Sequence, residues 1–385
     1  MSVDKLKQTV LGLVAVSLFL VSGAVLAEYP LNLTEGVTPT SHKVYELHMI
    51  ILYIVTVIGI AVFGVMAWSI FHHRKSKGAV AAQFHHSTAA EITWTIIPIL
   101  ILVGMAIPAT KTLVFMEKTG DAEMTLKVTG YQWKWKYDYL DEDISFFSTL
   151  SEEDNKARQL GSGIDPTTIE NYLKNVDKPV VLPVDTKIRI LTTAADVIHA
   201  WWVPALGWKR DAVPGYINDN WTYIEEPGIY RGKCTELCGK DHGFMPIVVH
   251  AVSKEDYAVW VAEQKAEQEA AAANSDKTFT KDELMTKGAE IYGTQCAACH
   301  QGEGQGIEGM FPALAGSSIA IGPAVDHIKT VLNGKNLMPA FKEQLNNADL
   351  AAVITYERSK WGNYEKVTAE GNADVVQPAD VEAAR

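Results

Sequence analysis

The chain has 385 residues, of which 48% are hydrophobic and 21% charged, and its formal net charge is -12 at pH 7. This acidic balance argues against nucleic-acid binding, because phosphate recognition depends on clustered basic residues. The four cysteines form two close pairs, Cys234 with Cys238 and Cys296 with Cys299. A disulfide-stapled scaffold is therefore excluded, and the pairs indicate attachment of a metal or cofactor.

The first apolar segment, residues 9–27, follows Lys5 and Lys7 and ends in small residues suited to a signal-peptidase site after Ala27. We predict that residues 1–27 are a cleaved signal peptide, with a retained membrane anchor as the alternative. Both interpretations place the chain from Glu28 onward outside the cytoplasm.

Two further apolar runs, residues 49–71 and 92–110, contain no charged residue. Each meets the roughly 20-residue requirement for a membrane-spanning helix. The loop between them carries three basic residues and no acidic residue before Glu91; the basic residues are Arg74, Lys75 and Lys77. Because basic loops stay in the cytoplasm, we predict a transmembrane hairpin that sends the C-terminal part of the chain across the membrane. Two buried core helices are the alternative, which the one-sign loop disfavours.

Short runs rich in β-branched and aromatic residues follow, separated by Gly, Pro and Asp clusters; they are residues 124–129, 131–139, 180–184, 187–192 and 247–252. This pattern predicts an antiparallel sandwich or barrel. The polar interval 151–178 is expected to be an inserted surface loop with one or two helical turns, and no chemistry is assigned to it.

A cluster of metal-binding residue types lies in this β region. Cys234, Cys238, His242 and Met245 occur within one short stretch, and His199 lies 35 residues before Cys234. Thiolate and imidazole ligands with a weak thioether are typical of copper electron-transfer sites, and two thiolates can bridge two copper ions. The alternative is a structural zinc site, which would use the two Cys and two His residues and would not need Met245.

The stretch 263–277 is helix-prone and polar and is expected to be a linker. After it, Cys296-Ala-Ala-Cys299-His300 is the signature of c-type haem attachment, in which two thiols bind the haem covalently and the adjacent His binds the iron. A redox Cys-x-x-Cys pair is the alternative, but no βαβ pattern surrounds these residues. We expect Met338 to be the second iron ligand, since it precedes a helix-like segment, 347–361. Met310 is the competitor, and it lies in what should be the loop on the His300 side.

Several motifs of the first 255 residues together resemble subunit II of haem–copper cytochrome c oxidases. They are residues 91–98, 130–135, 196–204, 211–215 and 234–245. The resemblance covers roughly residues 40–255 and implies a cupredoxin-like all-β domain that holds a binuclear CuA centre. It implies the following ligands: Cys234 and Cys238 as bridging thiolates, His199 and His242 as terminal imidazoles, Met245 as an axial ligand, and Glu236 through its backbone carbonyl. The Glu236 carboxylate would in addition bind a Mg or Mn ion shared with subunit I.

The same resemblance implies roles for residues outside the ligand set. Trp133 matches the family's surface tryptophan, at which electrons enter. The alternative is that Trp133 is a half-buried aromatic residue of a strand, which is what we expect Trp135 to be. Tyr131 stands where family members often have His, so a contact made by that His is not expected here. Glu91 corresponds to a carboxylate near a proton path in subunit I; a solvated acid at a helix N-terminus is the alternative.

Residues 278–365 resemble a small all-α class I cytochrome c, and its fusion behind a CuA domain resembles the caa type of bacterial oxidase. The resemblance implies a cytochrome-c oxidase, with electrons passing from a periplasmic cytochrome c through haem c and CuA to the haem of subunit I, for reduction of oxygen to water coupled to proton pumping. The implied partners are subunits I and III, the cytochrome donor and the lipid membrane, and the implied location is the bacterial inner membrane with both cofactor domains on the periplasmic side.

Two other functions remain open from the residues alone. One is the copper subunit of a nitric-oxide or nitrous-oxide reductase, and the other is a membrane-tethered copper-delivery protein. A quinol-oxidase subunit is disfavoured because that branch resembles this fold without the copper cysteines. The predicted organisation of the multidomain membrane protein is a signal peptide 1–27, a hairpin 28–118 with helices at about 46–72 and 91–115, a cupredoxin domain 119–262, a linker 263–277, a cytochrome domain 278–370 and a tail 371–385.

Overall fold

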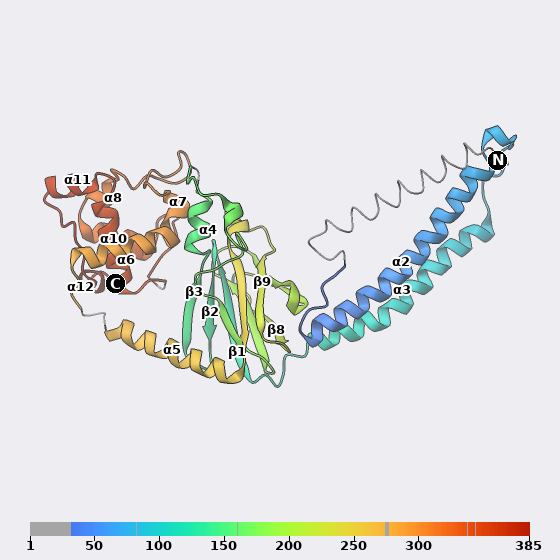
Figure 1. The fold of residues 1–385 in the computed structure, drawn as a ribbon, viewed down its shortest axis with the longest axis horizontal. Helices are drawn as coiled ribbons and strands as arrows, with labels where there is room; N and C mark the ends of the chain where they lie inside the picture. Colours follow the sequence, from blue (N-terminus) through green and yellow to red (C-terminus); the bar gives the residue numbers. More distant parts are fainter. Residues whose placement is uncertain (1–31, 82, 160, 274–276, 337, 343) are drawn as a thin grey trace. The chain divides into compact units, whose positions relative to one another are not determined.

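Two long apolar helices dominate the N-terminal side of the computed structural model: α2 (Pro39–His72) and α3 (Thr88–Met116), joined through the short turn η1 (Lys75–Lys77) (Figure 1). Their most apolar windows have mean hydropathies of 2.7 and 2.1, so by length and composition both helices can cross a membrane. Each begins before its expected start, because Pro39 suits the first turn of a helix and the Glu91 carboxylate accepts a hydrogen bond from the Ser87 N–H at the start of α3.

The structure describes residues 32–81, 83–159, 161–273, 277–336, 338–342 and 344–385. They fall into two compact units. The first contains Ser41–Thr112, and the second contains Leu113–Arg385 with Val37–Thr40. The predicted signal peptide, residues 1–27, lies outside the described residues. The second unit holds both a β-sandwich and a helical domain.

The β-sandwich consists of two five-stranded sheets, with strand orders β3-β2-β1-β5-β8 and β4-β10-β9-β6-β7. The strands are β1 (Met124–Tyr131), β2 (Lys134–Tyr139), β3 (Ile144–Ser148), β4 (Val180–Pro183), β5 (Lys187–Ala194), β6 (His199–Val203), β7 (Trp208–Ala212), β8 (Asn218–Tyr223), β9 (Gly228–Cys234) and β10 (Pro246–Val252). The predicted run 131–139 is split, because Tyr131 pairs with Lys134 across a turn at Gln132 and Trp133. Two strand pairs, β1 with β5 and β4 with β10, are parallel. In these two pairs the structure differs from the antiparallel arrangement that we predicted. These partners are not consecutive strands, so the chain returns to them by a crossover.

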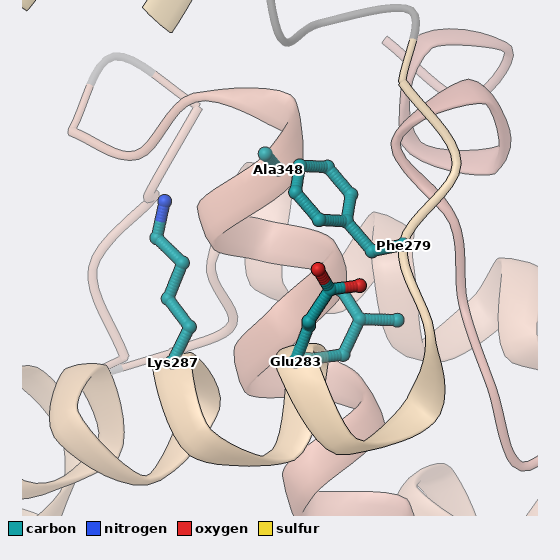
Figure 2. Close-up of a pocket in the computed structure, with 5 residues that line it drawn as sticks. Phe279, Glu283, Lys287 and Ala348 are labelled. Carbon is teal, nitrogen blue, oxygen red and sulfur yellow. The ribbon is translucent and has the colours of Figure 1, made fainter.

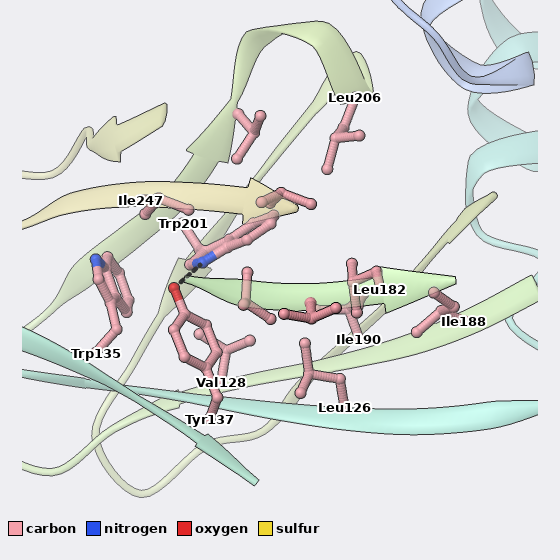
Figure 3. Close-up of a cluster of buried hydrophobic side chains, with 14 of the residues drawn as sticks. Leu126, Val128, Trp135, Tyr137, Leu182, Ile188, Ile190, Trp201, Leu206 and Ile247 are labelled. Atoms are coloured by element: carbon pink, nitrogen blue, oxygen red, sulfur yellow. Dashed lines mark hydrogen bonds between the residues drawn. The ribbon is translucent and has the colours of Figure 1, made fainter. Parts of the chain in front are cut away.

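The core of the sandwich lies between the inner faces of the two sheets. Burial alternates along β5, as expected for a strand with one face in the core. Figure 3 shows Trp201 and Tyr137 meeting inside this core, where the indole N–H donates to the phenol oxygen at 3.3 Å. Full burial of an aliphatic side chain such as Leu126 or Ile190 stabilises the fold by roughly 1.5–3 kcal/mol.

The inserted interval 151–178 is more ordered than an exposed loop. It contains the helix α4 (Glu152–Ala157) and the turn η2 (Pro166–Thr168). Asp154 is fully buried, and its carboxylate accepts hydrogen bonds from the Leu173 N–H and the Asn175 amide. The carboxylate therefore ties α4 to the end of the insertion, which explains how a polar stretch holds one conformation.

The helical domain follows helix α5 (Lys254–Ala273), whose length exceeds that of the expected linker. It comprises α6 (Lys281–Ile291), the π-helical turn η5 (Tyr292–Cys296), α7 (Ala297–His300), α8 (Ser318–Ile321), α9 (Ala324–Asn333), α10 (Asn347–Ser359), α11 (Asn363–Ala369) and α12 (Pro378–Glu382). Helices α6 and α10 cross closely at Gly288, where a Cβ atom would lie 2.2 Å from the Ala352 carbonyl oxygen. Val376 and Val381 are buried in this domain's core, so the segment expected to be a tail is part of the fold.

Candidate metal centres

The sulfur and imidazole groups predicted to bind metal lie together at one end of the sandwich. Cys234 ends β9, His199 begins β6, and Cys238, His242 and Met245 lie in the loop that leads to β10. The Sγ atoms of the two cysteines are 3.9 Å apart, and His199 Nδ1 is 3.9 Å from Cys234 Sγ. His242 Nδ1 and Met245 Sδ each lie 3.6 Å from Cys238 Sγ. All five side chains therefore converge on one small volume.

The backbone of Glu236 also reaches this cluster, since its carbonyl oxygen is 3.4 Å from Cys234 Sγ. The donor set then exceeds the four ligands that a structural zinc takes. Soft sulfur donors with imidazole suit copper, and the number of donors suits a pair of copper ions better than one ion. His199, Cys234, Cys238 and Met245 are each less than 5% exposed, whereas His242 is half-buried, so most of the cluster is shielded from water.

Acidic and thiol groups are arranged to favour metal binding. Asp196 Oδ1 lies 2.9 Å from His199 Nε2, which orients the imidazole with Nδ1 toward the sulfur atoms. The hydrogen bond between the two sulfur atoms lowers the pKa of Cys234 and raises the pKa of Cys238. The two thiols therefore lose their protons in separate steps, the first of them more easily than an isolated thiol would.

Side chains around the cluster hold its backbone in place. Trp133 Nε1 and Gln132 Nε2 both donate to the Cys238 carbonyl oxygen, at 3.2 and 2.8 Å. Trp135 is fully buried, and its Nε1 donates to the Met245 carbonyl oxygen at 3.3 Å. Neither Gln132 nor Asp196 was predicted as a site residue, although each lies within a few residues of one.

The haem-attachment residues lie at the start of the helical domain. Cys296 ends the π-helical turn η5, and Cys299 and His300 lie in α7. His300 Nδ1 is 2.9 Å from the Pro312 carbonyl oxygen, which fixes the imidazole and leaves Nε2 for an iron atom. Two thiols with an adjacent, oriented imidazole are the donor set that a c-type haem requires.

The structure separates the two candidates for the second iron ligand. Met338 packs against the helical core, whereas Met310 is 53% exposed and lies in the loop that also carries Pro312. Gly334 has φ of +71°, and a Cβ atom there would lie 2.4 Å from the Met338 carbonyl oxygen. Gly334 therefore permits the tight turn that brings Met338 to the core.

A hollow on the helical domain is not part of either centre. Figure 2 shows Phe279, Glu283, Lys287 and Ala348 lining it, and Leu284 completes the wall. Lys287 Nζ pairs with Asp349 at 2.5 Å. The lining of this hollow contains none of the predicted metal or haem ligands, so we assign the hollow no function.

Three family models match successive parts of the chain. The transmembrane domain of cytochrome c oxidase subunit II matches residues 27–112, and its periplasmic domain matches residues 124–252. Subunit III of cbb3-type cytochrome c oxidase matches residues 283–356. Fold and site together define a membrane-anchored electron-transfer protein with a sulfur-rich metal centre and a cytochrome c-type domain.

Two individual relatives give the same result. A probable cytochrome c oxidase subunit 2 of Rickettsia bellii is 40% identical over 255 residues, 66% of this chain and 91% of the relative. The subunit 2 of Cyanidium caldarium is 38% identical over 240 residues, 60% of this chain and 90% of the relative. The crystal structure of the periplasmic domain of subunit II of Bradyrhizobium japonicum cytochrome oxidase is 38% identical and covers 39% of this chain and 98% of that chain, with a TM-score of 0.34. The chain belongs to the cytochrome c oxidase subunit 2 family, which confirms the resemblance and the predicted fold class, and it is a subunit of a haem–copper terminal oxidase.

Proposed function

We propose that this chain is the electron-entry subunit of a caa-type oxidase, taking electrons from a periplasmic cytochrome c on haem c and delivering them through CuA to the haem of subunit I. The proposal rests on one observation: a single chain carries two sets of predicted cofactor ligands. The copper set is His199 with ligands from the stretch 234–245, and the haem set is Cys296, Cys299, His300 and Met338. When bound, the copper pair and the haem supply reversible one-electron chemistry. Oxygen reduction to water, coupled to proton pumping, then takes place in the assembled complex.

The ligand residues have distinct roles in this proposal. In this proposal two copper ions would be held by the Cys234 and Cys238 thiolates, the His199 and His242 imidazoles, the Met245 thioether and the Glu236 carbonyl oxygen. Their positions are set by the strand ends and by the hydrogen bonds to the Cys238 and Met245 carbonyls. A donor set that is already held in place would change little in geometry on electron transfer, which would keep the reorganisation energy low.

In the helical domain, Cys296 and Cys299 would hold the haem covalently, and His300 and Met338 would bind its iron. Ligation by His and Met raises the reduction potential, which suits acceptance of electrons from a respiratory donor. Trp133, which is hydrogen-bonded to the backbone of a copper ligand, is the proposed entry point to the copper site.

Further partners follow from the family. We propose that the Glu236 carboxylate binds a Mg or Mn ion shared with subunit I, that Glu91 lies near a proton path of subunit I, and that subunit III completes the complex. The proposed location is the bacterial inner membrane, with both cofactor domains on the periplasmic side.

Purification of the intact complex tests the proposal. We expect oxygen uptake with reduced cytochrome c, covalently bound haem, and an electron paramagnetic resonance spectrum in which one electron is shared by two copper nuclei. Consumption of nitric or nitrous oxide without oxygen uptake would assign the chain to a reductase. A single exchangeable copper ion without haem would instead identify a copper-delivery protein.

A further inference from the structure

The turn that precedes the haem-attachment motif contacts the β-sandwich. This turn, η5 (Tyr292–Cys296), is π-helical, a rare conformation that occurs frequently at functional sites. It lies in the same compact unit as the sandwich. Two residues of η5, Gly293 and Gln295, accept hydrogen bonds from side chains of the sandwich domain.

The first contact comes from the inserted interval, to which the sequence assigned no chemistry. Asn155 in α4 is 3% exposed, and its Nδ2 donates to the Gly293 carbonyl oxygen at 2.5 Å. The Asn155 Oδ1 atom accepts from Arg158 Nε at 2.7 Å. Asn155 is therefore held between the helical domain and a second residue of the insertion.

Arg158 extends this chain of contacts to the metal-ligand loop. Its Nη2 pairs with Asp241 Oδ2 at 3.2 Å, and both side chains are largely buried. Its guanidinium also lies over the ring of Phe244, with 4.3 Å between Cζ and the ring centroid. Asp241 and Phe244 flank His242, so a continuous polar path joins the haem-attachment turn to the copper-ligand loop.

Two further contacts are independent of the insertion. Lys134 in β2 is 5% exposed; its Nζ donates to Gln295 Oε1 at 3.0 Å and lies 4.9 Å from the centroid of the Phe341 ring. Lys240, between the copper ligands Cys238 and His242, lies over the ring of Phe311 at 4.7 Å. Phe311 is the neighbour of Pro312, whose carbonyl orients the His300 imidazole.

We infer that the insertion, through Asn155 and Arg158, and Lys134 of β2 form a docking surface for the chain's own haem domain, which holds the haem-attachment turn against the copper-ligand loop. The inference deepens the proposed function and rests on it, because it assigns the haem domain as the partner at this surface. Buried polar side chains that end on backbone or amide acceptors fix one orientation, whereas apolar contacts alone would allow the domains to slide.

The test compares hydrogen exchange of the haem-loaded full-length chain with that of variants, in the assembled complex. Asn155→Ala should raise the exchange rate of amides in residues 291–296 by about fivefold, the effect of losing one hydrogen bond from the docked state. Lys134→Met removes the independent contact and should have a similar effect. In the double variant the two effects should multiply to an increase of about 25-fold in the exchange rate, since the substitutions lie at separate contacts. Thr167→Ala, at an exposed position of the same insertion, is the matched control and should leave exchange in this segment unchanged.

A second readout is the rate of electron transfer from the haem to the copper site after a rapid pulse of reductant. This rate should fall most in the variants whose hydrogen-exchange rates rise most. Unchanged exchange in both single variants, with normal optical and resonance spectra of both centres, would overturn the docking inference. If Asn155→Ala prevents assembly, Lys134→Met alone decides the question by the same criterion. Absence of copper or haem from the unmodified complex would instead reject the proposed function, which the spectra reveal separately from the exchange data.

Discussion

The indole nitrogen of Trp133 donates a hydrogen bond to the carbonyl oxygen of Cys238 at 3.2 Å. A half-buried tryptophan is thereby joined directly to the backbone of a predicted copper ligand. Gln132 donates to the same oxygen at 2.8 Å, so the carbonyl keeps a partner if the indole N–H is removed. This arrangement allows the electronic role of the indole to be separated from its structural role.

Substitution Trp133→Phe should keep the ring and remove the N–H. We expect a stability loss of only about 0.5–1 kcal/mol, because Gln132 still satisfies the carbonyl. Reduction of the copper site should slow by about tenfold, equivalent to ~1.4 kcal/mol in activation free energy. Stopped-flow optical measurements of copper reduction check this. Trp202→Phe, at a 37% exposed position of β6, is the control, and an equal slowing in both variants would contradict a specific role of Trp133.

Met245 offers a test of the copper site itself. Its Sδ lies 3.6 Å from Cys238 Sγ and the side chain is 1% exposed. Met245→Leu conserves volume and should cost less than about 1.5 kcal/mol of stability. The variant should still bind two copper ions, but loss of the axial thioether should alter the resonance spectrum and the reduction potential. An unchanged spectrum and potential would show that Met245 is a core residue only.

Met338→Ala tests the haem ligand. Cys296 and Cys299 should still hold the haem, so covalent haem content should match that of the unmodified protein. The sulfur-to-iron absorption band should disappear, because the second axial position loses its thioether. Met310→Ala is the matched control, since Met310 is 53% exposed. The sulfur-to-iron band should persist in this variant. The opposite result would transfer the ligand assignment to Met310.

Most of the fold could be predicted because its signals are local. Uncharged apolar runs define α2 and α3, and Cys296, Cys299 and His300 are adjacent in sequence. Four members of the copper cluster lie in one short stretch and could be grouped from the sequence, whereas His199 reaches Cys234 through the pairing of β6 with β9. Spacing in sequence alone does not reveal that pairing.

The less predictable features depend on contacts between distant segments. Asp154 orders the insertion by accepting hydrogen bonds from residues about twenty positions later, and no periodic pattern in the sequence predicts these contacts. Asn155 reaches Gly293 across 138 positions of sequence. Two polar residues of the insertion, Asp154 and Asn155, are thus buried by tertiary contacts, which composition cannot show.

Lys134 gives a pH-dependent prediction. Burial lowers the pKa of its ammonium group from 10.5 to about 8. The folded protein therefore binds this proton less tightly than the unfolded chain. Below about pH 8 the folded state bears the full cost of the buried charge, and stability from this group rises as pH increases toward 10.5.

Lys134→Met removes this titration and provides its measurement. The difference in Tm between the variant and the unmodified protein should be most favourable to the variant near neutral pH, on top of a constant cost for the lost Gln295 contact, and should shift against the variant as pH rises from about 7 to about 10. Thermal unfolding of the full-length chain at a series of pH values checks this. Lys127→Met on the neighbouring strand β1, where the lysine side chain is 36% exposed, controls for loss of a positive charge as such. Parallel pH curves for the unmodified protein and Lys134→Met would show that folding does not lower the pKa of the Lys134 ammonium group.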